Sequence, residues 1–409
     1  MKNTDVNMIP VLLGGDLNSY NVARAFHERY GVISHVFGRY PIGPTLNSKI
    51  LNFHTVPKMD DPDIMVTELS NFADKNPDAH LILLGCTDDY ATLIINNRHR
   101  LESRYICPYI DPELSERLVS KAVFYEMCDK YGIPYPKTSV LDGSFRPEDL
   151  AEEALGFKYP VIVKPSSSIQ YWKHPFEGMK KVYTAADPDE AVKIMTEIYG
   201  AGYPDKMIIQ DMIPGDDANM YVLTAYSDST KKVKMTCLGH VLLEEHTPRG
   251  LGNHAAIITE QNGDLTERFR AMLDDLGYVG FSNFDIKFDP RDGSLRAFEI
   301  NLRQGRSNYY VTAAGINIAE LLVEDRVFHR DSEYRPCENS HLWHCIPFAV
   351  VKKYVHNPKA LADAKRLKKA GKSTSSLWYA PDLCFNPKRL VWVLEHLRRQ
   401  HGKYKKYCK

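Results

Sequence analysis

The sequence contains no run of about 20 apolar residues, the length needed to cross a bilayer. Its first residues, MKNTDVNMIPVLLGGD, lack the basic and apolar segments of a secretory signal. The eight cysteines are scattered and form no CxxC pair, which argues against a disulfide framework and against a zinc site. We therefore expect a cytoplasmic protein whose thiols stay reduced.

Other common signals are also absent. Gly14 and Gly15 follow an apolar run but do not begin a GxGxxG motif, so the dinucleotide fingerprint is excluded. There is no internal repeat and no low-complexity tract. His341, His344 and Cys345 form the one cluster of metal-ligating types, and histidines at a strand edge explain it better. With 409 residues, 44% of them hydrophobic, the chain is long enough for two or three packed domains.

The formal net charge of zero hides an uneven distribution. Residues 351–409 contain sixteen Lys or Arg and three Asp or Glu, a balance of +13, so the rest of the chain carries −13. A basic segment of this kind indicates an anionic partner: a charged substrate, a membrane surface at the inner face, or nucleic acid. Nucleic acid is not expected, because groove-reading residues are missing.

A solvated helical cap is the alternative for the same segment. Residues 364–372 and 391–400 have the pattern of amphipathic helices whose basic face stays wet. The apolar face expected to dock on the body consists of Leu390, Val393, Leu394 and Leu397.

Alternating strands and helices are predicted for the first 110 residues. Residues 8–15 form an apolar run, Asp16 can cap a helix that ends at Gly31, and further strands follow at 31–38 and 80–86. This alternation predicts a parallel sheet.

The middle of the chain has a different pattern. One continuous helix is predicted over 112–132. Strand, loop and strand follow at 158–182, and strand, turn and strand at 207–226. Residues 283–305 are predicted to form a hairpin.

Two lysines have sequence contexts that suit phosphate binding. Lys164 ends the apolar strand VIVK and is followed by Pro165 and three serines beginning at Ser166. An ammonium group beside a small polar loop can hold phosphate oxygens. Lys121 precedes it in the chain. Taken alone, these residues fit an ordinary strand-end lysine that faces water better than a phosphate site.

The segment QDMIPGDD, residues 210–217, is a second point of interest. A strand that stops at Pro-Gly leaves backbone groups that can bind an adenine edge, and a following carboxylate can hold ribose hydroxyls. An ordinary acidic turn fits the same letters.

The hairpin carries the strongest constellation. Glu299 and Asn301 lie two residues apart, so they share a face of one strand, and Asp285 lies on the paired strand. Two carboxylates and an amide oxygen form a hard oxygen site suited to Mg²⁺. Arg303, two residues further, adds positive charge for a transferring phosphoryl group.

Together, in this order, these stretches resemble the ATP-grasp superfamily over roughly residues 8–315. The resemblance implies an α/β and α+β architecture in which two lobes hold ATP. It implies a pre-ATP-grasp parallel-sheet domain at 1–118, an ATP-grasp domain at 119–330 with a mobile lid at about 137–213, and a basic C-terminal extension at 331–409.

The resemblance also implies roles for single residues. Lys121 and Lys164, with the loop at Ser166, would bind phosphates, and Asp285, Glu299 and Asn301 would hold Mg²⁺, or Mn²⁺ in its place. Arg303 would stabilise the phosphoryl group. The residues implied to line the adenosine are Gln210, Asp211, Met212 and Ile213 for the base and Asp217 for the ribose.

Asn283 departs from the D-alanine–D-alanine ligases, which have an arginine at this position. The positive charge for a tetrahedral intermediate must then come from Arg303, Arg306 or Arg249. His254 is a further candidate, for contact with substrate or for removal of the amine proton.

Four longer stretches, among them IPGDDANMYVLTAYSD and EINLRQGRSNYYVTAAG, more closely resemble the D-aspartate ligases of peptidoglycan crossbridge formation. Such enzymes join D-aspartate, activated as an acyl phosphate, to the side-chain amine of the third residue of a cell-wall precursor. Another ATP-grasp carboxylate–amine ligase, or a nucleotide-binding scaffold without catalysis, remains open.

Overall fold

The computed structural model describes residues 6–166, 168–180, 182–248 and 250–408. The chain forms two compact units. The large unit consists of Met1–Ser115, Asp216–Asp285 and Asn301–Lys409, and the small unit of Glu116–Gly215 and Ile286–Ile300. Within the described residues, no helix is both long and apolar enough to cross a membrane.

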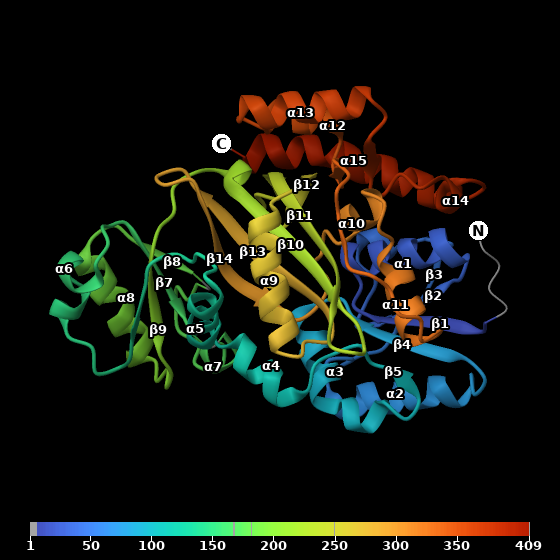
Figure 1. The fold of residues 1–409 in the computed structure, drawn as a ribbon, viewed down its shortest axis with the longest axis horizontal. Coiled ribbons are helices and arrows are strands. Elements are labelled where there is room, and N and C mark those ends of the chain that lie inside the picture. The colour runs from blue at the N-terminus through green and yellow to red at the C-terminus, as the bar shows by residue number, and fades with distance from the viewer. Residues whose placement is uncertain (1–5, 167, 181, 249, 409) are drawn as a thin grey trace. The chain divides into compact units, whose positions relative to one another are not determined.

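The large unit begins with a five-stranded parallel sheet in the order β3-β2-β1-β4-β5 (Figure 1). The parallel sheet predicted from alternating strands and helices is thus confirmed. The elements are β1 (Met8–Leu13), α1 (Leu17–Tyr30), β2 (Ser34–Gly38), η1 (Gly43–Thr45), β3 (Leu51–Thr55), α2 (Pro62–Asp74), β4 (His80–Gly85), α3 (Asp88–Leu101), β5 (Tyr105–Ile106) and α4 (Pro112–Val119).

Helix α1 begins and ends where the sequence predicts. The Asp16 carboxylate accepts a hydrogen bond from the Asn18 N–H at 3.0 Å, and Gly31 closes the helix in the left-handed region at φ 73°. The buried Asn18 side chain donates to the carbonyl of Cys86 at 2.8 Å and to that of Gln304 at 3.2 Å. The start of α1 is therefore fixed beside the segment that follows β14 (Ser294–Asn301).

A second sheet has the strand order β14-β13-β10-β11-β12-β16-β17, with β15 paired to β11. The predicted hairpin is confirmed, because the Gly293 N–H donates to the Asp289 carbonyl at 2.8 Å and closes the turn between β13 and β14. The elements of this stretch are η3 (Asp217–Asn219), β10 (Met220–Ser227), β11 (Val233–Glu244), β12 (His254–Glu260), α9 (Gly263–Asp275), β13 (Gly280–Asp289), β14, α10 (Tyr309–Ala313), α11 (Ile318–Arg326), β15 (Arg335–Pro336) and β16 (Leu342–His344).

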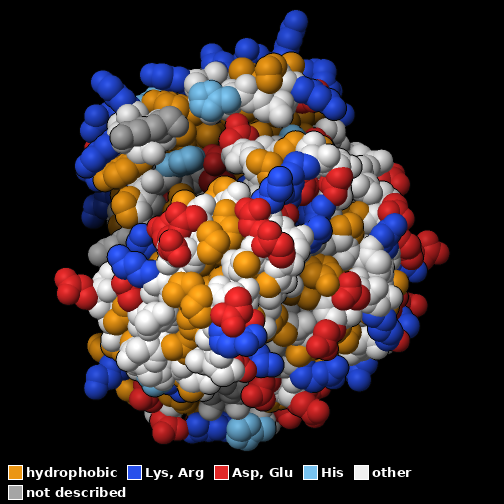
Figure 2. Space-filling view, turned by 90° about the vertical axis from the view of Figure 1, so that its left-hand side faces the viewer, with side chains coloured by type: hydrophobic (Ala, Val, Ile, Leu, Met, Phe, Trp, Pro, Cys, Tyr) orange, Lys and Arg blue, Asp and Glu red, His pale blue; other side chains and the backbone are white. Residues whose placement is uncertain are grey.

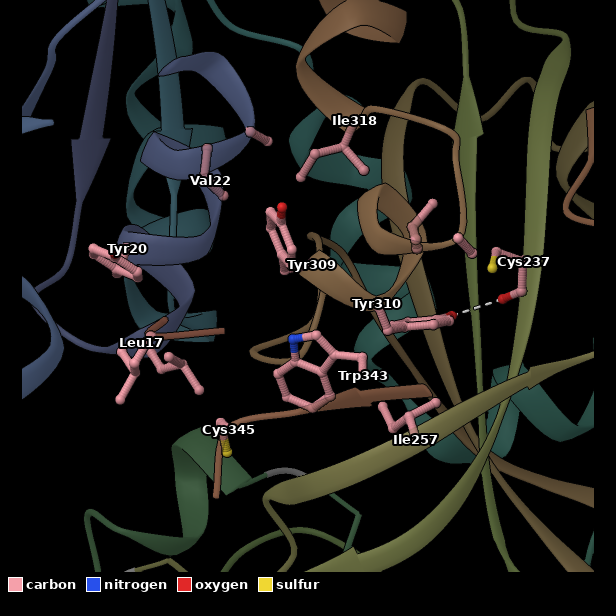
Figure 3. Close-up of a cluster of buried hydrophobic side chains, with 14 of the residues drawn as sticks. Leu17, Tyr20, Val22, Cys237, Ile257, Tyr309, Tyr310, Ile318, Trp343 and Cys345 are labelled. Carbon is pink, nitrogen blue, oxygen red and sulfur yellow. Dashed lines mark hydrogen bonds between the residues drawn. The ribbon is translucent and has the colours of Figure 1, made fainter. Parts of the chain in front are cut away.

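Residues after 330 share the core of the large unit. Trp343 is fully buried and lies near Tyr310 and Ile257 (Figure 3), and the Tyr310 hydroxyl donates to the Cys237 carbonyl at 2.7 Å. The chain ends with α12 (Phe348–Tyr354), α13 (Pro358–Lys369), β17 (Ser373–Ser375), α14 (Ala380–Leu383) and α15 (Pro387–Tyr407). The segment predicted as an extension is packed into this unit, while its bounds as a domain stay a prediction.

Buried polar contacts join the two ends of the chain. Asp382 accepts a hydrogen bond from the Tyr20 hydroxyl at 2.9 Å and forms an ion pair with Arg389, also at 2.9 Å. Both charged side chains of this pair are fully buried. Removing either partner would leave an uncompensated charge inside the core, which typically costs several kcal/mol.

Both predicted C-terminal helices form, as α13 and α15, but one predicted docking residue is wrong. Val393 is fully buried, and Leu390 and Leu397 pack against the core. Leu394 is 50% exposed. Residues 390, 393, 394 and 397 share the helical spacing of a single stripe, so the packing of α15, and not its periodicity, leaves Leu394 exposed.

The small unit contains a four-stranded sheet in the order β6-β9-β7-β8, in which all the pairs are antiparallel. Strand β7 confirms the first strand predicted within 158–182, whereas the predicted loop contains the short helix α7 and the return strand β8 begins only at Tyr183, just after the predicted segment. The elements are α5 (Lys121–Tyr131), β6 (Thr138–Leu141), η2 (Pro147–Leu150), α6 (Glu152–Leu155), β7 (Val161–Pro165), α7 (Ser168–Tyr171), β8 (Tyr183–Ala185), α8 (Pro188–Gly200) and β9 (Met207–Asp211).

The single helix predicted over 112–132 is wrong, because the segment forms two helices. Helix α4 ends at Val119, Ser120 is extended with ψ 114°, and α5 starts at Lys121. Serine favours the residue before a helix over a helix interior, so it starts a new helix here. Gly132 closes α5 in the left-handed region, as predicted.

Candidate active site

Lys164 is held inside the small unit, near the end of β7. Its side chain is buried, and its ammonium group donates to the Gln210 Oε1 at 2.9 Å. The Gln210 amide in turn donates to the Tyr125 hydroxyl at 2.8 Å and to the Thr138 hydroxyl at 2.9 Å. Two predicted nucleotide-binding residues, Lys164 and Gln210, therefore touch, and the strand pairing of β7 with β9 fixes their position. Ser166 follows Lys164, and its N–H donates to the Lys206 carbonyl at 3.0 Å.

A second predicted pair also meets in the small unit. Lys121, the first residue of α5, places its ammonium group 3.1 Å from the Glu299 carboxylate on β14. Both side chains remain partly accessible, at 15% and 34%. A residue predicted to bind phosphate thus contacts a residue predicted to bind a metal, as neighbouring groups of one Mg²⁺–nucleotide site would.

Polar groups at the end of β9 and in the segment after it form contacts that the sequence does not suggest. Arg291 contacts both oxygens of the Asp211 carboxylate, at 3.0 and 2.6 Å. The Ile213 carbonyl accepts a hydrogen bond from the Lys287 ammonium group at 2.9 Å. Met212, which lies between Asp211 and Ile213 in the sequence, is half-buried. The Asp211 carboxylate is thus committed to an ion pair, and contact with a base would fall to the backbone of Met212 and Ile213.

Asp285 and Asn301 meet within the large unit. The Asn301 amide group donates from Nδ2 to the Asp285 Oδ2 at 3.2 Å. With its NH₂ group used in this way, the Asn301 carbonyl oxygen is the atom left to face a ligand. Glu299 lies two residues before Asn301 on β14, which places both side chains on one face of that strand.

Two arginines after β14 are held by carboxylates that follow strands of both sheets of the large unit. Arg303 contacts both oxygens of Asp88, at the start of α3, each at 2.8 Å. Arg306 lies 3.3 Å from Asp16 and 3.4 Å from Glu245. Its NH1 group is closed to solvent and has no hydrogen-bond partner in the described part of the chain. Arg306 is therefore oriented but not fully satisfied, as expected of a ligand-binding guanidinium. Arg249 lies outside the described residues.

His254 begins β12 and is buried, 3.7 Å from the Glu244 carboxylate. Burial and the nearby Arg306 charge lower the pKa of its imidazole to about 4, so the ring is neutral at pH 7. Asp217 lies near His254. Its carboxylate accepts a hydrogen bond from the Glu244 N–H at 2.8 Å and contacts the His246 ring at 2.7 Å. A ribose hydroxyl bound by Asp217 would have to share its carboxylate with the Glu244 N–H and the His246 ring.

The described residues contain no group of three or more His, Cys, Asp or Glu side chains arranged to hold a metal. In particular, the His341 ring contacts the Thr374 hydroxyl at 2.9 Å and the His344 ring contacts the Ile346 carbonyl at 2.7 Å. The interpretation of this cluster as histidines of a strand edge agrees with these contacts.

Sequence reasoning missed Asp16, Asp88 and Glu245 as partners of the arginines. Asp16 was recognised only as a helix cap. The three contacts join residues 290, 215 and 61 positions apart. A pattern within a short segment cannot reveal contacts between residues so far apart. The one available signal was the surplus of carboxylates in the first 350 residues, some of which could pair with arginines.

The fold is similar to those of solved ligases and synthetases. It aligns with an L-amino acid ligase from Bacillus licheniformis at a TM-score of 0.55 and 14% identity, over 81% of this chain and 78% of that one. It also aligns with N5-carboxyaminoimidazole synthetase from Staphylococcus aureus complexed with ADP, at a TM-score of 0.58 and 14% identity, over 84% and 83%. No family model matches the sequence. The chain is an enzyme of the ATP-grasp carboxylate–amine ligase type.

The sequence comparison narrows this class. The chain is 39% identical to the D-aspartate ligase of Enterococcus faecium over 409 residues, which covers 98% of this chain and 96% of the relative. The chain belongs to the D-aspartate ligase family.

Proposed function

We propose that this enzyme joins the β-carboxylate of D-aspartate to the side-chain amine of the third residue of a peptidoglycan precursor, with ATP as the phosphoryl donor. The observation that carries the proposal is the 39% identity to a D-aspartate ligase over nearly the whole of both chains. Identity spread over the full length supports a shared substrate more strongly than a shared fold does.

ATP is proposed to bind through the small-unit residues described above. Lys121, Lys164 and the loop at Ser166 would contact phosphates, because a buried or half-buried ammonium group gains most from a multiply charged ligand. Gln210, which fixes Lys164, would then act on the phosphates through that lysine. The backbone of Met212 and Ile213, which follow the ion-paired Asp211, is proposed to contact the adenine, and Asp217 the ribose.

Asp285, Glu299 and Asn301 are proposed to hold Mg²⁺. Their donor set fits this ion: two carboxylates and an amide oxygen are hard ligands, and the Asn301 NH₂ group already points at Asp285. Bound there, the ion would neutralise phosphate charge. Mn²⁺ accepts similar ligands and is proposed as a substitute.

In the first chemical step, the substrate carboxylate attacks the γ-phosphorus of ATP and displaces ADP. Arg303, fixed by its two contacts with Asp88, is proposed to stabilise the negative charge of the phosphoryl group in transfer. The resulting acyl phosphate hydrolyses easily, so water must be excluded. Residues 137–213 are the proposed lid, and their membership in one compact unit supports this assignment.

In the second step, the amine attacks the acyl phosphate, and phosphate leaves from the tetrahedral intermediate. Arg306 is proposed to stabilise the oxyanion of that intermediate. Asp16 and Glu245 set its orientation, while its NH1 group remains without a partner in the described chain. The neutral His254 ring is proposed to accept a hydrogen bond from the incoming amine.

The amine acceptor is proposed to be anionic, and the enzyme to work in the cytoplasm at the inner membrane face. Support comes from the basic helices of the C-terminal segment: Figure 2 shows Lys and Arg side chains gathered along the top of the molecule, where Figure 1 draws α12, α13 and α15. Each basic residue near an anionic membrane adds on the order of 1 kcal/mol, less at high salt.

A screen of ADP release tests the substrate assignment. D- and L-amino acids are offered one at a time, with and without the cell-wall precursor. D-aspartate is expected to give ADP and, with the precursor, an amide product, whereas L-aspartate gives neither. ADP release with a different acid alone would replace D-aspartate, and no release with any acid would contradict a ligase activity.

Arg303 and Arg306 are expected to fail at different steps. Hydroxylamine captures an acyl phosphate as a hydroxamate without help from the enzyme. Arg303→Met should lose both hydroxamate and amide, while Arg306→Met should lose about 100-fold or more of amide formation and keep hydroxamate formation.

Arg330→Met serves as the control, because Arg330 is 63% exposed and pairs at the surface with Glu324. Thermal unfolding of all three variants is measured in parallel. Equal loss of hydroxamate in both active-site variants would assign Arg306 to phosphoryl transfer instead.

A further inference from the structure

Helix α15 carries a groove that the active-site description does not use. A cavity of about 390 Å³ runs along one face of the helix, and its lining includes Lys388, Trp392, Glu395, His396, Arg399 and Lys403. These positions recur every three or four residues, so they form a single stripe. From Lys388 to Lys403 the helix rises about 22 Å.

The groove is positively charged. Lys388, Arg399 and Lys403 face one carboxylate, Glu395, which is itself held by Arg398 and Arg399 at 2.6 Å each. Lys388 and Lys403 are exposed and form no ion pair with any other described residue. Burial, together with the nearby Lys403 charge, lowers the pKa of His396 to about 4 and leaves this ring uncharged at pH 7.

The groove leads to the candidate catalytic arginine. A second, smaller cavity shares Gln400 and Lys403 with it and is also lined by Glu245. Glu245 contacts the Arg306 guanidinium at 3.4 Å. The Tyr404 hydroxyl fixes this end of α15, because it donates to the Glu244 carbonyl at 2.7 Å. The chain of contacts therefore runs from Lys388, along α15, to Arg306.

We propose that the α15 groove binds the diphosphate group of the amine acceptor and aims the acceptor's amine at Arg306. This inference rests on the proposed function. Lys388, at the far end of the groove, suits the diphosphate because its ammonium group contributes a point charge to the oxygens, while Lys403, about 22 Å further along the helix, would contact an anionic group nearer the amine. A track of about 22 Å equals the extended length of roughly six residues. A sugar and three residues, which separate the diphosphate from the amine in the proposed acceptor, are of this length.

The diphosphate could be carried by a nucleotide or by a lipid, and the groove would bind the diphosphate of either through the same contacts.

The first test measures steady-state kinetics. The double variant Lys388→Ala/Lys403→Ala is expected to raise the KM for the acceptor about tenfold or more, with kcat and the KM values for ATP and D-aspartate within twofold. The dependence of this KM on salt should become flatter.

The matched control is Lys75→Ala/Lys193→Ala, which removes two exposed lysines outside the groove and outside the basic C-terminal segment. Its constants should equal those of the unaltered enzyme. An unchanged acceptor KM in the groove variant, or an equal rise in the control, would overturn the proposal.

A binding measurement keeps this test separate from catalysis. Trp392 lines the groove, so its fluorescence is followed while inorganic pyrophosphate is added to enzyme saturated with a non-hydrolysable ATP analogue. The signal should change in the unaltered chain and vanish in Trp392→Phe and in the groove variant. If the enzyme makes no amide at all, the proposed function fails, yet this titration still judges the groove.

Competitors then identify the source of the diphosphate. Uridine diphosphate and vesicles containing a diphosphate lipid are each tested against pyrophosphate. Competition by the nucleotide supports a soluble acceptor, and competition by vesicles alone supports a lipid-linked one. Absence of pyrophosphate binding to the unaltered chain contradicts the site.

Discussion

Asp285→Asn and Glu299→Gln are each expected to reduce turnover by about 100-fold or more, with the fold intact. Each substitution removes one negative charge from the proposed metal site, which must balance the charge of a triphosphate. The Asn301 amide can still donate to an asparagine oxygen at position 285, so the hairpin keeps its contact at 3.2 Å. Steady-state ADP release at increasing Mg²⁺ measures the effect.

The expected signature is a higher Mg²⁺ requirement in both variants. Glu299→Gln also weakens the contact with Lys121, but a partly exposed pair of this kind contributes only about 0–1 kcal/mol to stability. Asp264→Asn is the control, since Asp264 is 76% exposed on α9. Full activity of either site variant would show that the metal ligands are assigned wrongly.

Lys164→Met is expected to weaken ATP binding roughly ten- to hundredfold, while the affinity for D-aspartate stays near its original value. The reason is the fixed position of the ammonium group: Gln210 holds it at 2.9 Å, so its charge is oriented before nucleotide binds. A titration with a non-hydrolysable ATP analogue measures the dissociation constant directly.

Lys158→Met provides the comparison, because Lys158 is an exposed lysine of the same unit. Loss of the Lys164 ammonium leaves the Gln210 oxygen without this donor, so thermal unfolding must be recorded as well. Unaltered nucleotide affinity in a folded Lys164→Met protein would remove Lys164 from the phosphate site.

Local chemistry made some of this structure predictable. The capped helix from Asp16 to Gly31 and the turn at Gly293 follow from residue types whose conformational preferences act within a few positions. Glu299 and Asn301 could be placed on one face because strand geometry alternates strictly. Signals of this kind can be read from a short stretch of sequence, because they depend only on neighbouring residues.

The remaining features depend on partners far away in the chain. Asp211 was predicted to line the adenine, but its carboxylate forms an ion pair with Arg291, 80 positions away in the sequence. Leu394 looked like part of an apolar stripe, and only the packing of α15 decides which side of the helix is covered. Tertiary contacts set these outcomes, and a single sequence does not record them.

The buried Arg389–Asp382 pair and its contact with Tyr20 have a consequence for synthesis on the ribosome. The first sheet emerges roughly 300 residues before α15 does, which at about 5–20 residues per second is a delay on the order of 15–60 s. During that interval Tyr20 and the other core residues of α1 lack the C-terminal groups that cover them. A nascent chain of this protein should therefore depend on chaperones until translation ends, and a premature stop before Pro387 should lead to degradation of the whole large unit.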